Sequence, residues 1–389
     1  MPIRKRRPRF SGLFAEPSTG LEPSTPPTIQ FGDKTLRRTR VFRGASSPME
    51  TEAVLRKAAI SLAGSDAFAR LVSLLERLDR PSPHKLAVLM YHRVLELGQA
   101  PTHDPTVVSA TPAQFEEQIA FLAANVPLLS LDELLAVRRG EAQAPPGAVV
   151  VTFDDAYFDF AEHAWPALRR HRVPVTLFVP TGFPGDPTRP FWWDHLHHAL
   201  VTTQRRGAIA TPFGELSLVS ATDRTQTFRL LRDRLKATPH HQAMAILDGV
   251  TAQLEVAPPD GSVLNWDELR RLAGEGVVLA PHGQTHALLD WLSAEEALEE
   301  IRGSVTDLER EIGSAPRVFA YPAGGLTEGV VELVKEEGFE IAFETIRGLN
   351  DLRRVDWLRL WRINVGRRST LPLLRAQLLS WPVRRRAAR

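Results

Sequence analysis

The sequence contains no cysteine among its 389 residues. Disulfide bonds, thiolate zinc sites and cysteine nucleophiles are therefore excluded, and any bound metal must be held by His, Asp or Glu side chains. Long apolar runs are also lacking, because no stretch approaches the roughly 20 residues that a membrane-spanning helix needs. No apolar segment follows the basic start as it would in a secretory signal peptide, so the sequence predicts a cytoplasmic protein.

Net charge is also small, at a formal +2, but the charges are unevenly distributed. Residues 1–43 carry +7 and residues 384–389 carry +4, which leaves −9 for the middle of the chain. Two basic tails on an acidic body predict either peripheral contact with an anionic surface, such as a membrane leaflet or an acidic glycan, or solvated tails with no partner. No nucleic-acid-binding motif accompanies the basic residues, so nucleic acid is not an expected partner.

The pattern along the chain predicts one decorated enzyme domain. Residues 1–48 are rich in Pro, Ser, Thr, Gly and Arg without periodicity, which predicts disorder. A helical lead-in is expected over 49–84, a catalytic domain over 85–383 with a mostly helical insertion at about 204–262, and a basic tail over 384–389. Within the domain, short apolar runs alternate with helical patterns, which is typical of parallel βα units. These runs lie at 86–90, 149–153, 173–179, 277–280, 318–320 and 339–343.

One apolar run ends in two adjacent carboxylates, Asp154 and Asp155. Two neighbouring aspartates repel each other if both are ionised, so the pair predicts a bound cation or a shared proton. The alternative is a helix N-cap with an acidic first turn. Other runs end at His92, at His282-Gly283-Gln284-Thr285-His286 and at the loop 321–325. The carboxyl ends of parallel barrel strands meet at one mouth, so all of these residues are expected to converge there.

Two histidines and one carboxylate form a common divalent-metal site that leaves positions open for water and substrate. Gly283 allows a loop tight enough for the rings of His282 and His286 to face one ion. Taken alone, the His-x-x-x-His spacing is also typical of two surface histidines, and His92 is open to interpretation as a packed core histidine. Joined to the paired aspartates, the spacing favours a metal centre.

These motifs resemble those of the polysaccharide deacetylases, the NodB-like carbohydrate esterases. Thr152-Phe153-Asp154-Asp155 and the segment 282–286 are similar to the first two motifs of that family. The segments 89–94 and 319–324 resemble variant motifs of the branch with a Tyr-His start. The resemblance covers about residues 85–365, and it implies an irregular (β/α) barrel with about seven parallel strands.

The resemblance also implies roles for individual residues. Asp154 is expected to be the general base, and Asp155, His282 and His286 are expected to bind a divalent metal, with zinc as the expected ion and cobalt or nickel as alternatives. The backbone N–H near Ala323 is the expected oxyanion donor, and His92 is the candidate acid. The remaining candidates, both for substrate binding, are Tyr321 and Trp193.

Three positions depart from the family pattern. Ala156 replaces a glycine, Ala320 stands where an arginine is usual, and the segment 362–365 stands where a late histidine motif is usual. Arg317 is near the second of these positions but does not correspond to it. The absent arginine and histidine motivate an alternative, a catalytically weak glycan-binding module.

The leading expectation is a hydrolase that removes N-acetyl groups from sugars of a polysaccharide or lipid-linked glycan. Hydrolysis of a non-sugar amide on the same scaffold is a further alternative. The aromatic run 191–193 is expected either to stack on sugar rings or, with better support, to anchor the insertion by packing.

Overall fold

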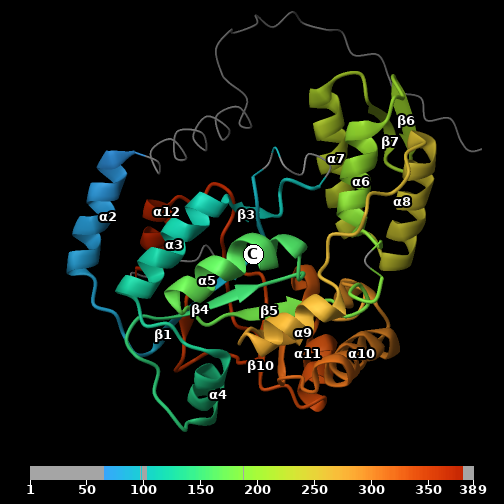
Figure 1. Ribbon diagram of the computed structural model, residues 1–389. Coiled ribbons are helices and arrows are strands. Elements are labelled where there is room, and N and C mark those ends of the chain that lie inside the picture. Colours follow the sequence, from blue (N-terminus) through green and yellow to red (C-terminus); the bar gives the residue numbers. More distant parts are fainter. Residues whose placement is uncertain (1–64, 97, 99–102, 187, 380–389) are drawn as a thin grey trace, which may run out of the picture. The chain divides into compact units, whose positions relative to one another are not determined.

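The computed structural model describes residues 65–96, 98, 103–186 and 188–379, which all belong to one compact unit that starts at residue 52 (Figure 1). The expected disordered segment 1–48, the first part of the lead-in and the basic tail 384–389 lie outside the described residues. The described part of the lead-in forms helix α2 (Asp66–Leu78), which begins at the N-cap Ser65.

Five parallel strands form the main sheet in the order β12-β1-β4-β5-β8. They are β1 (Lys85–Tyr91), β4 (Ala148–Phe153), β5 (Thr176–Val179), β8 (Val278–Pro281) and β12 (Ile363–Asn364). A second parallel pair consists of β9 (Val318–Ala320) and β10 (Ile341–Phe343). A short strand, β11 (Asn350–Asp351), runs antiparallel to β1, and β2 (Arg93–Val94) pairs with β3 (Val108–Ala110).

Contacts on both sides of the β9–β10 pair close the sheet into a barrel. The segment 357–362 bridges β10 to β12, because Leu360 N donates to Ala342 O at 2.9 Å and the chain then continues into β12. On the other side, β8 contacts β9. The seven parallel strands agree with the expected irregular (β/α) barrel.

The alternation of side chains along the strands decides which residues face the interior. Val149, Val151 and Phe153 pack in the cluster that contains the outer helices α3 (Pro112–Asn125) and α5 (Trp165–His171). Val150 belongs instead to the interior cluster, with Val88, Phe178 and Ile341. Because successive strand residues point to opposite faces, Thr152 and then Asp154 follow Val150 on the interior side.

The remaining helices of the barrel lie around the sheet and at its amino end. Helix α4 (Leu131–Arg139) shares the interior cluster with Leu86 and Ala148, which are at the amino ends of β1 and β4. The other helices are α9 (Trp266–Gly274), α10 (Ala294–Ile312), α11 (Glu328–Glu336) and α12 (Leu371–Leu378). Helix α10 begins with a capping box between Ser293 and Glu296 and ends at Gly313, whose φ is +90°.

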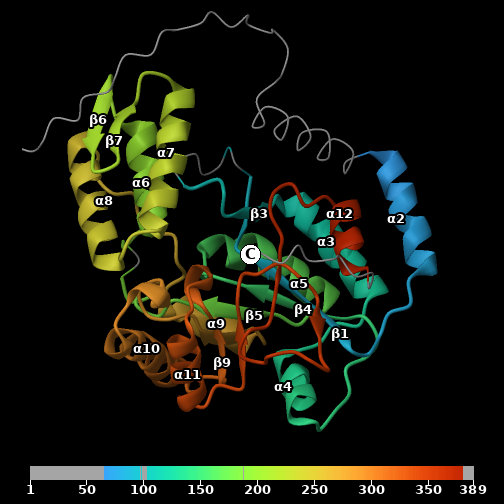
Figure 2. The same ribbon diagram turned by 180° about the vertical axis from the view of Figure 1, so that it is seen from behind.

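The insertion forms its own small core beside the barrel. It contains α6 (Trp192–Thr202), a hairpin of β6 (Ala208–Thr211) and β7 (Gly214–Ser217), α7 (Ala221–Lys236) and α8 (His240–Leu254). The two ribbon views show α6, α7 and α8 side by side (Figures 1 and 2). Their shared apolar cluster starts within α6, so the inserted unit begins about a dozen residues before the expected boundary at 204.

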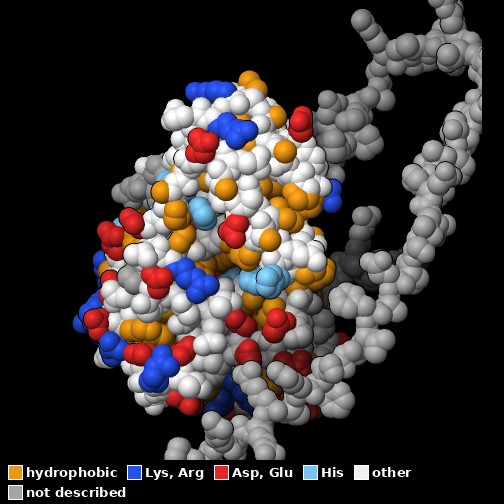
Figure 3. All heavy atoms as spheres, turned by 90° about the vertical axis from the view of Figure 1, so that its right-hand side faces the viewer, with side chains coloured by type: hydrophobic (Ala, Val, Ile, Leu, Met, Phe, Trp, Pro, Cys, Tyr) orange, Lys and Arg blue, Asp and Glu red, His pale blue; other side chains and the backbone are white. Residues whose placement is uncertain are grey.

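The surface of the unit mixes charges of both signs. On the face shown in Figure 3, Lys and Arg side chains are interspersed with Asp and Glu, and apolar side chains lie between them. Across the described part of the chain, no helix combines the length and the apolar character that crossing a bilayer would require.

Candidate active site and metal centre

The carboxyl ends of the barrel strands surround a cavity of about 260 Å³. Its lining includes seven of the eight site residues predicted from the sequence: His92, Asp154, Asp155, His282, His286, Ala323 and Trp193. Trp193 lies in α6, and the other six follow β1, β4, β8 and β9, whose parallel course brings their ends to one mouth. The expected convergence is therefore present in the structure.

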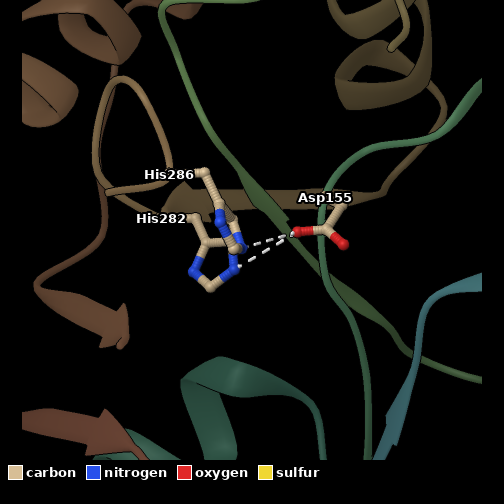
Figure 4. A group of neighbouring side chains, drawn as sticks. All are labelled: Asp155, His282 and His286. Atoms are coloured by element: carbon tan, nitrogen blue, oxygen red, sulfur yellow. Dashed lines mark ion pairs between the residues drawn. The ribbon is translucent and has the colours of Figure 1, made fainter. Parts of the chain in front are cut away.

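Asp155, His282 and His286 form a buried cluster that fits a divalent cation. Asp155 Oδ1 lies 3.5 Å from His282 Nε2 and 3.2 Å from His286 Nε2, and Figure 4 shows both imidazoles facing this one oxygen. All three ligand atoms lie within 4.8 Å of one another. Asp155 Oδ1 is buried and finds no hydrogen-bond donor among the described residues, which leaves it available to an ion.

The hydrogen bond on the far side of His282 favours the metal-binding tautomer. His282 Nδ1 lies 2.7 Å from Ala320 O, and because a carbonyl only accepts, Nδ1 carries the proton. The lone pair of Nε2 then points toward Asp155, as in many protein metal centres where the other ring nitrogen is held by a backbone carbonyl. The donor set, two imidazole nitrogens and one carboxylate, suits zinc.

A partly buried carboxylate from α10, that of Glu300, holds the loop that carries the two histidines. Glu300 Oε2 accepts the backbone N–H groups of Gln284 and Thr285 at 2.8 and 2.9 Å, and Glu300 Oε1 accepts the Thr285 hydroxyl at 2.6 Å. Gly283 has φ +70°, and a Cβ there would lie 2.9 Å from Glu300 Oε2. The glycine is thus required both by its backbone conformation and by the close approach of Glu300.

Asp154 makes a buried ion pair with Arg362 that the sequence did not reveal. Arg362 Nη1 and Nη2 donate to Asp154 Oδ1 and Oδ2, each at 2.7 Å, and both side chains are at most 3% exposed. Arg362 is held in turn by its Nε, which donates to Glu344 O at 3.1 Å. The barrel therefore supplies a guanidinium to the first aspartate from residue 362, although Ala320 stands where the family usually has its arginine.

The electrostatics of the cavity keep Asp154 ionised. Burial alone would raise the pKa of the Asp154 carboxyl, but Arg362, together with His282 and His92, outweighs that effect and lowers the pKa below its usual value. At His92, burial lowers the pKa below its ordinary value, against the opposing effect of Asp155 and Asp154. A carboxylate and a neutral imidazole therefore face the same cavity at neutral pH.

His92 lies immediately after β1 and is partly exposed to the cavity. Its backbone N–H donates to Ser109 Oγ at 2.9 Å, which ties the end of β1 to β3. The alternative interpretation as a packed core histidine does not fit this position, because the residue lines the mouth of the barrel.

The turn after β9 brings Ala323 to the cavity but leaves Tyr321 in the core. Ala323 has φ +50°, an uncommon conformation for a residue with a Cβ, and it lines the cavity. Tyr321 was expected to bind substrate, yet it is fully buried and its hydroxyl donates to Leu358 O at 3.0 Å. Among the described residues that line the cavity, Tyr321 is absent, so its placement is that of a core residue.

Trp193 serves mainly as a packed anchor. It is 5% exposed, its ring stacks on Phe191 with 4.4 Å between centroids, and it meets His286 edge-on at 4.9 Å. Its Nε1 donates to the Tyr157 hydroxyl at 3.0 Å. Trp192, its neighbour, is less buried and also lines the cavity, so it presents the more accessible aromatic face.

Ala156 occupies a strained position directly after the paired aspartates. Asp155 and Ala156 have φ +73° and φ +50°, both in the left-handed region that favours glycine. The replacement of the usual glycine by alanine is therefore a more substantial departure than the sequence suggested, because the fold must hold a Cβ in this conformation.

Comparisons with known proteins agree with this geometry. The family model described as polysaccharide deacetylase matches residues 141–342, just over half of the chain. A poly-β-1,6-N-acetyl-D-glucosamine N-deacetylase of Staphylococcus aureus is 33% identical over 79 residues, which are 20% of this chain and 27% of that protein. The chain thus spans about a quarter of the length of the curated relatives it matches.

One solved structure shows the same fold, and a second matches the chain at a lower TM-score. The deacetylase PplD of Streptococcus pyogenes, in complex with acetate, has a TM-score of 0.51 and 16% identity, covering 77% of this chain and 99% of its own. IcaB of Ammonifex degensii has a TM-score of 0.47 and 19% identity, covering 76% of this chain and 98% of its own.

Proposed function

Since this chain belongs to the polysaccharide deacetylase family, we propose that it is a metal-dependent hydrolase that removes N-acetyl groups from the sugars of a polysaccharide or lipid-linked glycan. The observation that carries the proposal is the pairing of two features in one cavity. A carboxylate and two imidazoles fit a divalent ion, and a second carboxylate beside them is held ionised by Arg362. Hydrolysis of an acetamide needs both features.

Each residue of the site has a proposed role in the hydrolysis. Asp155, His282 and His286 hold the ion, for which zinc is the proposed identity; when bound, it polarises the acetamide carbonyl and acidifies water. Asp154 is not part of this ligand set and takes a proton from the attacking water. Ala323 lines the cavity, and its backbone N–H is the proposed oxyanion donor.

His92 is proposed to deliver a proton to the leaving nitrogen. Its imidazole is neutral at rest, so it first takes up the proton that the attacking water releases to Asp154 and then passes it to the nitrogen. An amide nitrogen leaves as an amine, so a proton must reach it as the C–N bond breaks. His92 lines the cavity from the end of β1, next to the paired aspartates. The products are acetate and a free amino sugar.

The position of Arg362 bears on the alternative of a catalytically weak glycan-binding module. One of the two motives for that alternative was the missing arginine, and Arg362 supplies a guanidinium to Asp154 from another strand. The other motive was the missing late histidine, and in our proposal His92 takes the place of that histidine as the acid.

Acetate release from N-acetylated oligosaccharides, measured on the full chain with added zinc or cobalt, tests the proposal. We expect release that a chelator abolishes and that Asp154→Asn lowers by at least a hundredfold. Glycan binding without acetate release would overturn the enzyme and support the binding module. Cytoplasmic location and peripheral membrane contact remain predictions that cell fractionation would test.

A further inference from the structure

Two cationic side chains from the insertion enter the candidate active site. Arg232 and Lys236 lie one turn apart near the end of α7, on the same face of that helix, and both line the cavity that contains Asp154 and Asp155. The family pattern in the sequence did not point to either residue, because α7 belongs to the insertion and not to the barrel.

Arg232 is fixed in place before any ligand binds. Its Nη1 donates to Thr106 Oγ1 at 2.9 Å, while Nε and Nη2 donate to the exposed Asp233. Thr106 is itself held by Asp104, which accepts its backbone N–H and its hydroxyl at 2.8 Å each. The guanidinium is therefore a preorganised cationic wall of the cavity.

Lys236 lies within the electrostatic influence of Asp104, Asp155 and Asp233 but directly contacts none of them. The structure records neither an ion pair nor a hydrogen bond for its ammonium group in the described part of the chain, and the side chain stays accessible from the cavity. Of these carboxylates, Asp104 is held by Thr106 and Asp233 by Arg232, and Asp155 belongs to the candidate metal site. An ammonium group without a hydrogen-bond partner in a partly enclosed cavity favours the binding of an anionic ligand group.

The position of Lys236 indicates where an anionic ligand group would bind. A second, smaller hollow adjoins the cavity, and the two share Trp192, Lys236 and Leu288. Trp291, which is 41% exposed, lines the second hollow and offers a flat apolar face of the kind that packs on sugar rings. Lys236 thus lies at the edge where the candidate active site meets this hollow and the exposed Trp291.

We propose that the substrate carries an oxyanion, either a phosphate ester or a carboxylate, next to its N-acetylated sugar, and that Lys236 and Arg232 bind this group. The inference rests on the proposed deacetylase function and narrows its substrate class. Both cationic side chains line the cavity that contains the paired aspartates. The pair therefore acts as a local binding site within that cavity.

Matched substrates and variants test the proposal on the full-length, zinc-loaded protein. Acetate release is measured from a neutral N-acetylated disaccharide, from the same sugar bearing a phosphate ester, and from one bearing a uronic acid. We expect a preference of about tenfold or more in kcat/KM for one of the charged substrates over the neutral one. Which charged substrate is preferred tells phosphate from carboxylate.

Lys236→Gln and Arg232→Gln are expected to raise KM for the preferred charged substrate about tenfold, and to change the neutral reaction far less. Arg234→Gln is the matched control, because Arg234 lies on the opposite face of α7 with its guanidinium over the Phe213 ring. It removes the same charge from the same helix and should leave the preference intact.

Three results would count against the inference. Equal rates for neutral and charged substrates would overturn it while the deacetylase function stands. Equal losses on all substrates in Lys236→Gln would make Lys236 a structural residue. If no substrate releases acetate, the proposed function fails. Calorimetry then tests the inference separately, by comparing the affinities of the Asp154→Asn protein for the phosphate-bearing and the neutral sugar. Equal affinities would overturn the inference.

Discussion

Replacing Arg362 by methionine keeps most of the side-chain volume and removes the guanidinium that holds Asp154. The two hydrogen bonds lost are each 2.7 Å long, and the pair is almost completely buried. Removing one partner of such a pair typically costs about 3–5 kcal/mol of stability, because the remaining charge is left buried and unpaired. The pKa of Asp154 should rise, since the nearby guanidinium is what favours the charged form.

The sign of the pH dependence follows from the lowered pKa of Asp154 in the folded protein. A carboxyl with a lowered folded-state pKa contributes stability above its unfolded pKa and loses it as the pH falls through the folded value. The Arg362→Met variant should therefore differ most from wild type at neutral pH, and the difference should shrink in acid. In activity, the acidic limb of kcat/KM should move to higher pH.

Urea unfolding at pH 7 and at pH 4, together with the pH profile of acetate release, measures both effects. Arg362→Lys is the matched control, because it keeps the charge but cannot form the two parallel hydrogen bonds, so it should recover only part of each loss. An Arg362→Met protein with an unshifted acidic limb and a stability within about 0.5 kcal/mol of wild type would refute our assignment of Arg362 as the group that keeps Asp154 ionised.

Two further substitutions address the other parts of the site. His92→Gln should lower kcat by roughly 10²–10⁴-fold with zinc affinity retained, because it removes a proton donor and no metal ligand. Single-turnover acetate release measures the rate, and zinc titration measures the affinity. A near-normal kcat would return His92 to a structural role. Glu300→Gln should weaken zinc binding by about 10–100-fold. The Glu300 carboxylate holds the loop that presents His282 and His286, and the variant loses the charge-assisted hydrogen bonds to two backbone N–H groups of that loop. The exposed Glu299, on the same helix, provides the control as Glu299→Gln, and an equal effect of both would contradict a role for the loop.

Much of the barrel and the core of its site can be predicted because the signals are local. An all-apolar run such as 149–153 indicates a strand buried on both faces, and its period of two determines which side Asp154 takes. Gly283, between the two histidine positions, likewise predicts the tight loop that the structure shows there. Strand ends were less certain: the run 173–179 becomes a strand only from Thr176, because Pro174 has no N–H to give to a ladder.

The features that were missed depend on contacts between distant segments. Arg362 meets Asp154 across 208 positions, and the only local hint was a charged residue alternating with apolar ones in 360–365. Arg232 and Lys236 reach the cavity because the insertion packs beside the mouth, which no pattern within α7 encodes. Tyr321 stands in a motif that points to the site, yet the turn after β9 buries it.

The crystal structure of the zinc-loaded protein, with the ion located by its anomalous scattering, tests the central claim most directly. Our account predicts one zinc bonded to a carboxylate oxygen of Asp155 and to Nε2 of both His282 and His286, each at about 2.0–2.2 Å, with Asp154 still paired to Arg362. A zinc bound elsewhere, or a cluster of these three side chains that stays metal-free at saturating zinc, would contradict it.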